Sequence, residues 1–148
     1  MSHELIAMNS STDVKNLLNK ISFALVDSGA SVCMFGDSKF FVPGSLKSTY
    51  KTIRCADGKF LYAHWEGTVI LIKDPTKPPH PSNTIVCKDA LLVEGIAKSL
   101  LSVPQLDDTY SFLMEKGKCT ISSPPLENGK RTPIYKIQQR RYQNIYTA

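Results

Sequence analysis

Ala24-Leu25-Val26-Asp27-Ser28-Gly29-Ala30-Ser31 is the stretch that decides the fold, because an acid, a hydroxyl and a glycine directly follow an apolar run. A short apolar run that ends at a turn signal is typical of a buried β-strand. A carboxylate at the end of such a strand is costly to bury alone, so we expect Asp27 to find hydrogen-bond donors or to share a proton with a second acid. Ser28 supplies a hydroxyl, and Gly29 permits a close backbone approach.

Size and composition limit the remaining choices. The 148 residues suffice for one domain with a real core and are too few for two large ones. The formal net charge is +5, but the basic residues are scattered, so we expect no nucleic-acid partner for this domain alone. No stretch reaches the roughly 20 apolar residues of a membrane span, and the start lacks the form of a signal peptide. We therefore expect no membrane association and a cytoplasmic location.

Cysteine spacing argues against a metal centre. Cys33, Cys55, Cys87 and Cys119 are far apart, with no C-x-x-C pair and no histidine at ligand spacing. This pattern predicts reduced, mostly buried thiols and no metal site.

Apolar residues alternate with turn signals along most of the chain, which predicts many short strands. We expect strands at 21–26, 49–55, 60–72, 84–86, 90–93, 111–115, 118–122 and 134–137. Asp57-Gly58 predicts a hairpin between the second and third of these, and the proline-rich loop at 73–83 is expected to be irregular. Leu100 and Leu101 lead into one short helix with Pro104 in its first turn. Many strands with little helix predict an all-β domain, a compact barrel or sandwich.

Hydrolysis by carboxylates usually needs two of them, and this chain supplies one in a suitable setting. The other acids Asp37, Asp57 and Asp107-Asp108 lie in turns without an apolar strand before them. A symmetric dimer brings identical residues together at its two-fold axis, so the second acid is expected to be Asp27 of another copy, with a water held between the two. Asp-Ser-Gly alone is a common tripeptide, and in most proteins it is a turn or a helix cap.

The chain resembles the retropepsins, and more closely the proteases of copia-type long-terminal-repeat retrotransposons, over roughly residues 21–122. The matching motifs are Leu25–Ser31, Ala56–Lys59, Glu66–Val69, Val93 and Ala97–Leu106. The resemblance implies a closed β-barrel with a flap hairpin and one short helix, functional as a two-fold homodimer. It further implies an aspartic endopeptidase that processes its own Gag-Pol polyprotein in virus-like particles, without a metal or organic cofactor.

The same resemblance implies a role for each matching residue. Asp27 is expected to be catalytic, with Ser28, Gly29 and Ala30 supporting its loop. The residues Ala56, Asp57, Gly58 and Lys59 are expected in the substrate-binding flap, and Leu100, Leu101 and Ser102 in the core behind the active site. Segments 1–20 and 123–148 flank this domain, with Leu5–Met8 and Ile134–Ile137 as candidate strands of the dimer interface. Segment 123–148 ends in a linker tail.

Two other hypotheses stay open at this point. The first is a catalytically silent domain of the same fold that serves as a dimerisation or peptide-binding module. The second is nucleic-acid binding through the basic tail at 138–148.

Overall fold

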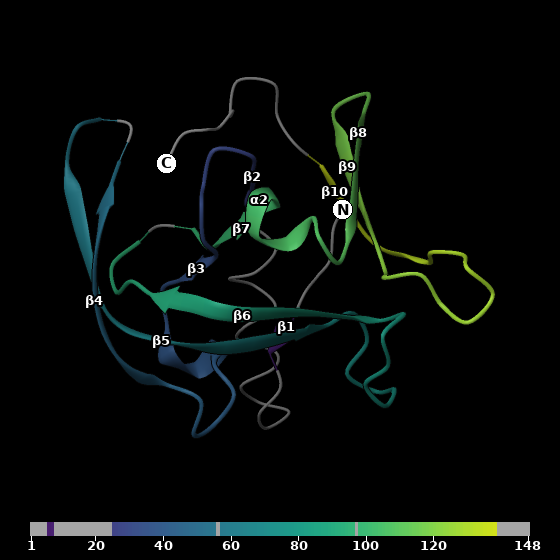
Figure 1. Ribbon diagram of the computed structural model, residues 1–148, viewed down its shortest axis with the longest axis horizontal. Coiled ribbons are helices and arrows are strands. Elements are labelled where there is room, and N and C mark those ends of the chain that lie inside the picture. Colours follow the sequence, from purple (N-terminus) through teal and green to yellow (C-terminus); the bar gives the residue numbers. More distant parts are fainter. Residues whose placement is uncertain (1–5, 8–24, 56, 97, 139–148) are drawn as a thin grey trace.

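The computed structural model describes residues 6–7, 25–55, 57–96 and 98–138 of this chain. In these ranges the ordered elements are almost all β-strands, arranged in two sheets (Figure 1). The helical elements are the 3-10 turn η1 (Ser38–Phe40) and the four-residue helix α2 (Val103–Leu106). The prediction of an all-β domain with one short helix is therefore confirmed for the described residues.

The larger sheet has seven strands and positions the stretch around Asp27. Its order is β1-β5-β6-β3-β7-β2, and β4 pairs with β5 beside this path. The strands are β1 (Ile6–Ala7), β2 (Leu25–Asp27), β3 (Met34–Phe35), β4 (Lys47–Arg54), β5 (Phe60–Ile72), β6 (Thr84–Leu92) and β7 (Leu100–Ser102). β2 and β7 run parallel, with Asp27 level with Ser102, so two segments far apart in sequence end at the same place.

β4 and β5 form the predicted hairpin, which curves upward on one side of the molecule (Figure 1). In its turn the Asp57 carboxylate accepts a hydrogen bond from the Lys59 N–H at 2.9 Å, and Gly58 adopts a φ of 86°. That positive φ is the reason an Asp-Gly pair favours such a turn. The first strand begins at Lys47, slightly before the predicted start at 49.

The two faces of this hairpin have different surroundings. On the inner face, the buried side chains Ile53 and Ala63 belong to an apolar cluster with Met34, Leu91 and Val93. On the other face Tyr50 stacks on Tyr62, with ring centroids 6.1 Å apart, and both rings are more than half exposed. Cross-strand aromatic pairs of this kind stabilise a sheet. The hairpin is thus anchored to the core on one face and stabilised by its own side chains on the other.

β6 is one continuous strand, and the prediction of two separate strands at 84–86 and 90–93 is wrong. The polar pair Lys88 and Asp89 between them lies in an irregularity of the β5–β6 pairing, where the register shifts between Gly67 and Val69. Asp89 has a φ of 57°, a conformation that aspartate tolerates better than most residues. A bulge therefore accommodates the polar pair without ending the strand.

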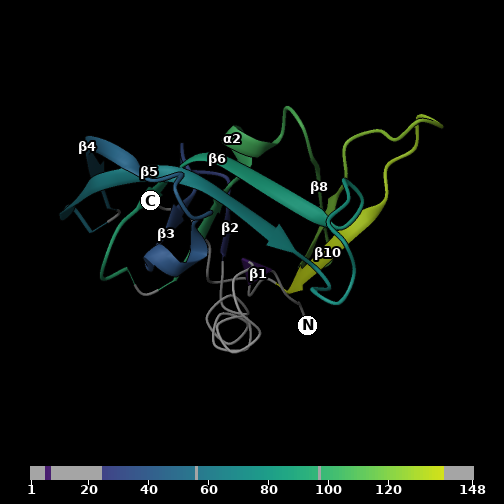
Figure 2. The same ribbon diagram turned by 90° about the horizontal axis from the view of Figure 1, so that it is seen from below.

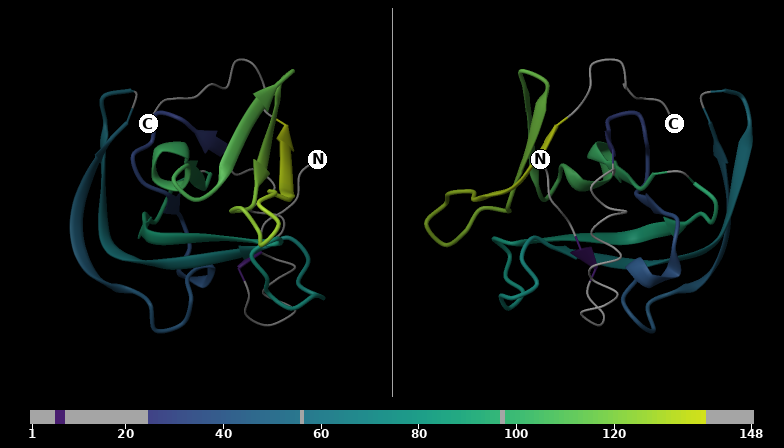
Figure 3. Two further views of the ribbon diagram at one scale, coloured as in Figure 1. Left: turned by 45° about the vertical axis from the view of Figure 1, so that its right-hand side comes forward. Right: turned by 180° about the vertical axis from the view of Figure 1, so that it is seen from behind.

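The smaller sheet has the order β10-β9-β8 and lies at the opposite end of the molecule from the β4–β5 hairpin (Figures 2 and 3). Its strands are β8 (Ser111–Glu115), β9 (Lys118–Ser122) and β10 (Pro133–Gln138). The predicted hairpin at 111–115 and 118–122 is confirmed. A single apolar cluster contains Val69 and Leu71 of the larger sheet together with Cys119 and Ile121 of the smaller one. The two sheets therefore share a core.

A closed barrel is not found among the described strands, because their pairing runs from β1 at one end to β2 at the other. The candidate interface strands both have partners within their own chain: Ile6–Ala7 pairs with β5, and β10 pairs with β9. Residues 1–5 and 8–24, which include Leu5, Met8 and part of the strand predicted at 21–26, lie outside the described residues, as does the tail at 139–148.

Truncation of a core leucine tests the packing of the larger sheet. Leu71 is fully buried, so we expect Leu71→Ala to lower the free energy of unfolding by about 2–5 kcal/mol, through lost burial and the cavity left behind. Leu113→Ala is the matched control, because Leu113 is 55% exposed, and it should cost less than about 0.5 kcal/mol. Urea unfolding measures both, and equal losses would contradict this assignment of the core.

The pH dependence of stability tests the core of the smaller sheet. Burial raises the pKa of the Cys119 thiol to about 11 from its ordinary value of 9.0. As the pH rises above about 9, the unfolded chain loses this proton first, so we expect the free energy of unfolding to fall between about pH 9 and 11. Cys119→Val removes this thiol, and its stability should fall less steeply over the same range. Identical slopes in urea unfolding of the two proteins would refute the prediction.

Candidate functional site

Asp27 is a buried acidic residue, and the turn that directly follows it is exposed. It ends β2, is only 3% exposed, and is the one buried acidic residue in the part of the chain that the structure describes. Its Oδ1 accepts a hydrogen bond from the Gly29 N–H at 2.7 Å, which fixes the orientation of the carboxylate. The following residues Ser28 and Gly29 are exposed, and Ala30 is buried again. The chain thus turns outward for two residues directly after the acid.

Ser102 ties this turn to the neighbouring strand. Its fully buried hydroxyl donates to the Ala30 carbonyl at 2.6 Å and accepts from the Gln105 N–H at 3.1 Å. The second bond makes Ser102 the N-cap of α2. The Ser102 N–H donates to the Cys33 sulfur at 3.3 Å. One residue therefore satisfies polar groups of both the Asp27 turn and the helix.

Gln105 makes a second connection to the same turn, which sequence reasoning missed. Its Oε1 accepts from the Cys33 N–H at 2.7 Å, and its Nε2 donates to the Lys88 carbonyl of β6 at 3.1 Å. The available signal was the spacing Ser102-x-x-Gln105, the pattern of a capping box. Here the glutamine side chain bonds the turn after Asp27 and β6, so the pattern marks a tertiary link as well as the start of a helix.

Most of the cysteines are buried in the core. All four are free thiols, with Cys33, Cys87 and Cys119 buried and Cys55 half-buried, as the sequence predicted. A hydrogen bond with Cys33, together with burial, raises the pKa of the Cys87 thiol well above its ordinary value. A buried thiol that keeps its proton is a poor nucleophile and a poor metal ligand. The Cys33 and Cys87 thiols therefore act as buried hydrogen-bonding groups next to the turn.

The structure brings some of the predicted site residues together and leaves others apart. Leu100, Leu101 and Ser102 form β7, which pairs residue by residue with Leu25, Val26 and Asp27 of β2. The expected flap residues Asp57, Gly58 and Lys59 lie in the turn of the β4–β5 hairpin, where the hydrogen bonds of Gly58 and Lys59 are local. Figure 1 shows this hairpin rising beside the loop that joins β2 and β3. Ala56 lies outside the described residues.

Neither a metal site nor a membrane-spanning helix is found in the described ranges. No group of three or more His, Cys, Asp or Glu side chains there has an arrangement that would hold a metal ion. None of the helices described is long and apolar enough to span a membrane.

Removal of the Ser102 hydroxyl tests its link to the Asp27 turn. We expect Ser102→Ala to lower the free energy of unfolding by about 1–3 kcal/mol, because it leaves the Ala30 carbonyl without its donor and removes the cap of α2. Ser48→Ala on exposed β4 is the control and should change stability by less than about 0.5 kcal/mol. Urea unfolding measures the loss, and amide NMR should place the spectral changes at residues 27–33. Changes restricted to α2 would contradict the link.

Comparison with known proteins places this arrangement in a family. A scan against protein families matches residues 24–110, more than half of the chain, to the family described as Pol polyprotein, beta-barrel domain. Searches of curated proteins and of solved structures found no match. The matched segment contains β2 with Asp27, the β4–β5 hairpin, and β7 with α2. The chain therefore belongs to the family of Pol polyprotein β-barrel domains and is a component of a retroelement polyprotein.

Proposed function

We propose that this domain is an aspartic endopeptidase of the retropepsin type that processes its own polyprotein as a two-fold homodimer. The observation that carries the proposal is Asp27, a buried carboxylate at the end of a strand, followed by an exposed Ser-Gly turn. No other acidic residue is buried in the ranges that the structure describes, so a second catalytic acid has to come from another copy. A two-fold axis beside the turn would supply it, since identical residues meet there.

The chemistry follows from placing two carboxylates close together. Two such groups do not both ionise, so the pair shares one proton and holds a water molecule. The ionised carboxylate accepts a proton from that water as it attacks the peptide carbonyl, and the protonated one donates to the carbonyl oxygen. The Gly29 N–H, which donates to Asp27 Oδ1, orients the carboxylate in each copy. We expect Ser28, which is exposed beside it, to hydrogen-bond to the turn of the partner copy.

Substrate binding is assigned to the apolar inner face of the β4–β5 hairpin. The buried cluster on that face is flanked by the half-buried side chains Val32, Leu61, Ile96 and Leu100. Val32 follows the Asp27 turn, and Leu100 pairs with Leu25 of the strand before it. We infer that the hairpin is the flap over an extended peptide, with bulky apolar residues preferred at the cut. The copia type and the setting in cytoplasmic virus-like particles belong to the same proposal.

A second candidate is a catalytically silent dimerisation or peptide-binding module of the same fold. The observation in its favour is the 3% exposure of Asp27, because a carboxylate so covered does not reach a substrate in the single chain. The two candidates differ in one result: a stable dimer without peptide cleavage supports the module.

Replacement of the acid by its amide tests the endopeptidase directly. We expect Asp27→Asn to reduce cleavage of a polyprotein fragment by about a thousandfold or more, because an amide neither accepts nor supplies the required proton. Molar mass by light scattering should remain that of the dimer, and the circular dichroism spectrum should be unchanged. Asp108→Asn is the control, since Asp108 is exposed, and it should cleave at the normal rate. Undiminished cleavage by Asp27→Asn would refute the assignment.

A further inference from the structure

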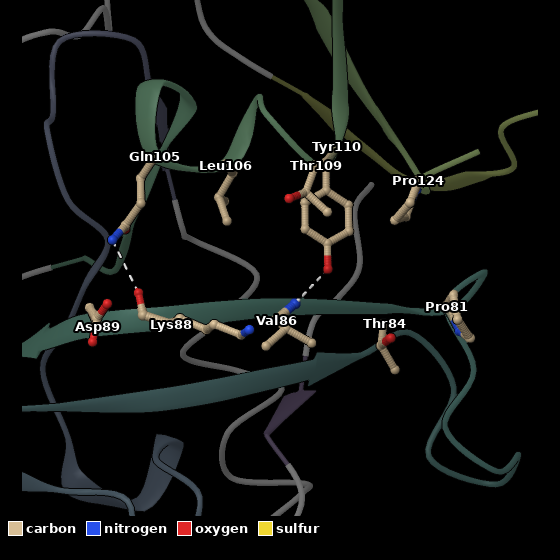
Figure 4. A pocket seen from close by; sticks show the side chains of 10 residues that line it. All are labelled: Pro81, Thr84, Val86, Lys88, Asp89, Gln105, Leu106, Thr109, Tyr110 and Pro124. Carbon is tan, nitrogen blue, oxygen red and sulfur yellow. Dashed lines mark hydrogen bonds between the residues drawn. The ribbon is translucent and has the colours of Figure 1, made fainter. Parts of the chain in front are cut away.

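A pocket of about 520 Å³ lies beside β6, away from the turn of the β4–β5 hairpin. Figure 4 shows its two walls, with β6 on one side and the segment from α2 to the start of β8 on the other. Val86 and Lys88 line it from β6, and Gln105, Leu106 and Tyr110 line it from the opposite wall. The volume is in the usual range for ligand pockets. Nothing in the proposed endopeptidase mechanism uses this space.

One edge of β6 faces this pocket. The Val86 N–H donates to the Tyr110 hydroxyl at 2.8 Å, and the Lys88 carbonyl accepts from Gln105 Nε2 at 3.1 Å (Figure 4). On this side β3 pairs with β6 only at Leu91 and Leu92. Because the N–H and C=O groups of one residue lie on the same edge of a strand, the Val86 carbonyl also points toward the pocket. The pocket wall therefore presents three main-chain groups of β6, and two of them are hydrogen-bonded to Tyr110 and Gln105 of the opposite wall.

The lining indicates which kind of ligand fits. Val86, Leu106 and the Tyr110 ring supply apolar surface beside the strand edge. Lys88 and Asp89 are the only charged lining residues, and their formal charges cancel. This neutrality disfavours phosphate groups and other polyanions. A peptide with an apolar side chain matches the apolar lining, and its main chain matches the main-chain groups at the edge of β6.

Gln105 connects the pocket to the turn after Asp27. Its Nε2 donates a hydrogen bond to the Lys88 carbonyl at the pocket, while its Oε1 accepts one from the Cys33 N–H. A peptide N–H that pairs with the Lys88 carbonyl would take the place of Gln105 Nε2. The side-chain amide is one planar group, so a change at its nitrogen also moves the oxygen that holds Cys33.

We propose that this pocket binds an extended peptide that adds to the edge of β6, and that Gln105 transmits its binding to the Asp27 turn. The site is separate from the inner face of the β4–β5 hairpin, to which substrate binding is assigned. Its test measures binding, so it is independent of whether the domain cleaves peptides.

The experiment is an amide NMR titration of the 148-residue chain carrying Asp27→Asn, which prevents cleavage of the probe. The probe is a short capped peptide in which threonine and valine alternate, with a terminal lysine for solubility. We expect shifts at Val86, Lys88 and Tyr110, and a further shift at Cys33. The same peptide N-methylated at alternate residues should bind at least about tenfold more weakly, because it has lost half of its main-chain donors.

Two variants separate binding from transmission. Thr109→Trp fills the pocket at an exposed lining position and should weaken binding at least about tenfold, whereas Thr109→Ser leaves the space open and should bind normally. Gln105→Met should keep the shifts at Val86 and Lys88 and lose the shift at Cys33. The proposal is overturned if no shifts occur, if they are confined to the Asp27 turn and the hairpin, or if the N-methylated probe binds equally well. Retention of the Cys33 shift in Gln105→Met overturns the transmission through Gln105.

Discussion

The site depends on the two hydrogen bonds of the Ser102 hydroxyl. This hydroxyl is fully buried, it satisfies the Ala30 carbonyl, and it caps α2. A parallel pair such as β2 and β7 leaves both strand ends at the same edge, and the chain has to turn there without leaving polar groups unsatisfied. The Ser102 hydroxyl satisfies a polar group in the turn after β2 and another in the helix after β7. The Asp27 turn and the helix are therefore held in one fixed relationship.

Gln105 extends that relationship to a third element. Through its two amide atoms it joins the Cys33 N–H to the Lys88 carbonyl of β6. All the residues of this network lie within 24–110, the segment that matches the Pol polyprotein β-barrel family. Here two side-chain hydrogen bonds hold the chain that follows Asp27: Ser102 donates to the Ala30 carbonyl, and Gln105 accepts from the Cys33 N–H.

The local features of the fold were predictable from sequence. The Asp57-Gly58 turn, the hairpin at 111–122 and the proline in the first turn of α2 each rest on the conformational preferences of a few adjacent residues. The bulge at Lys88 and Asp89 was not predicted, because two polar residues usually end a strand and only pairing with β5 shows that this one continues. Closure of the barrel was likewise a matter of long-range pairing, and it is not found among the described strands.

The sequence by itself determined that the chain is all-β, that Asp27 ends a buried strand, and that the cysteines are reduced and mostly buried. These properties follow from hydrophobic patterning and turn chemistry, which act over neighbouring residues. Only the tertiary structure decided which groups surround Asp27. The parallel register sets Asp27 level with Ser102, and Gln105 reaches Cys33 across 72 positions of the chain. Contacts between such distant positions depend on how the strands assemble, which no local pattern encodes.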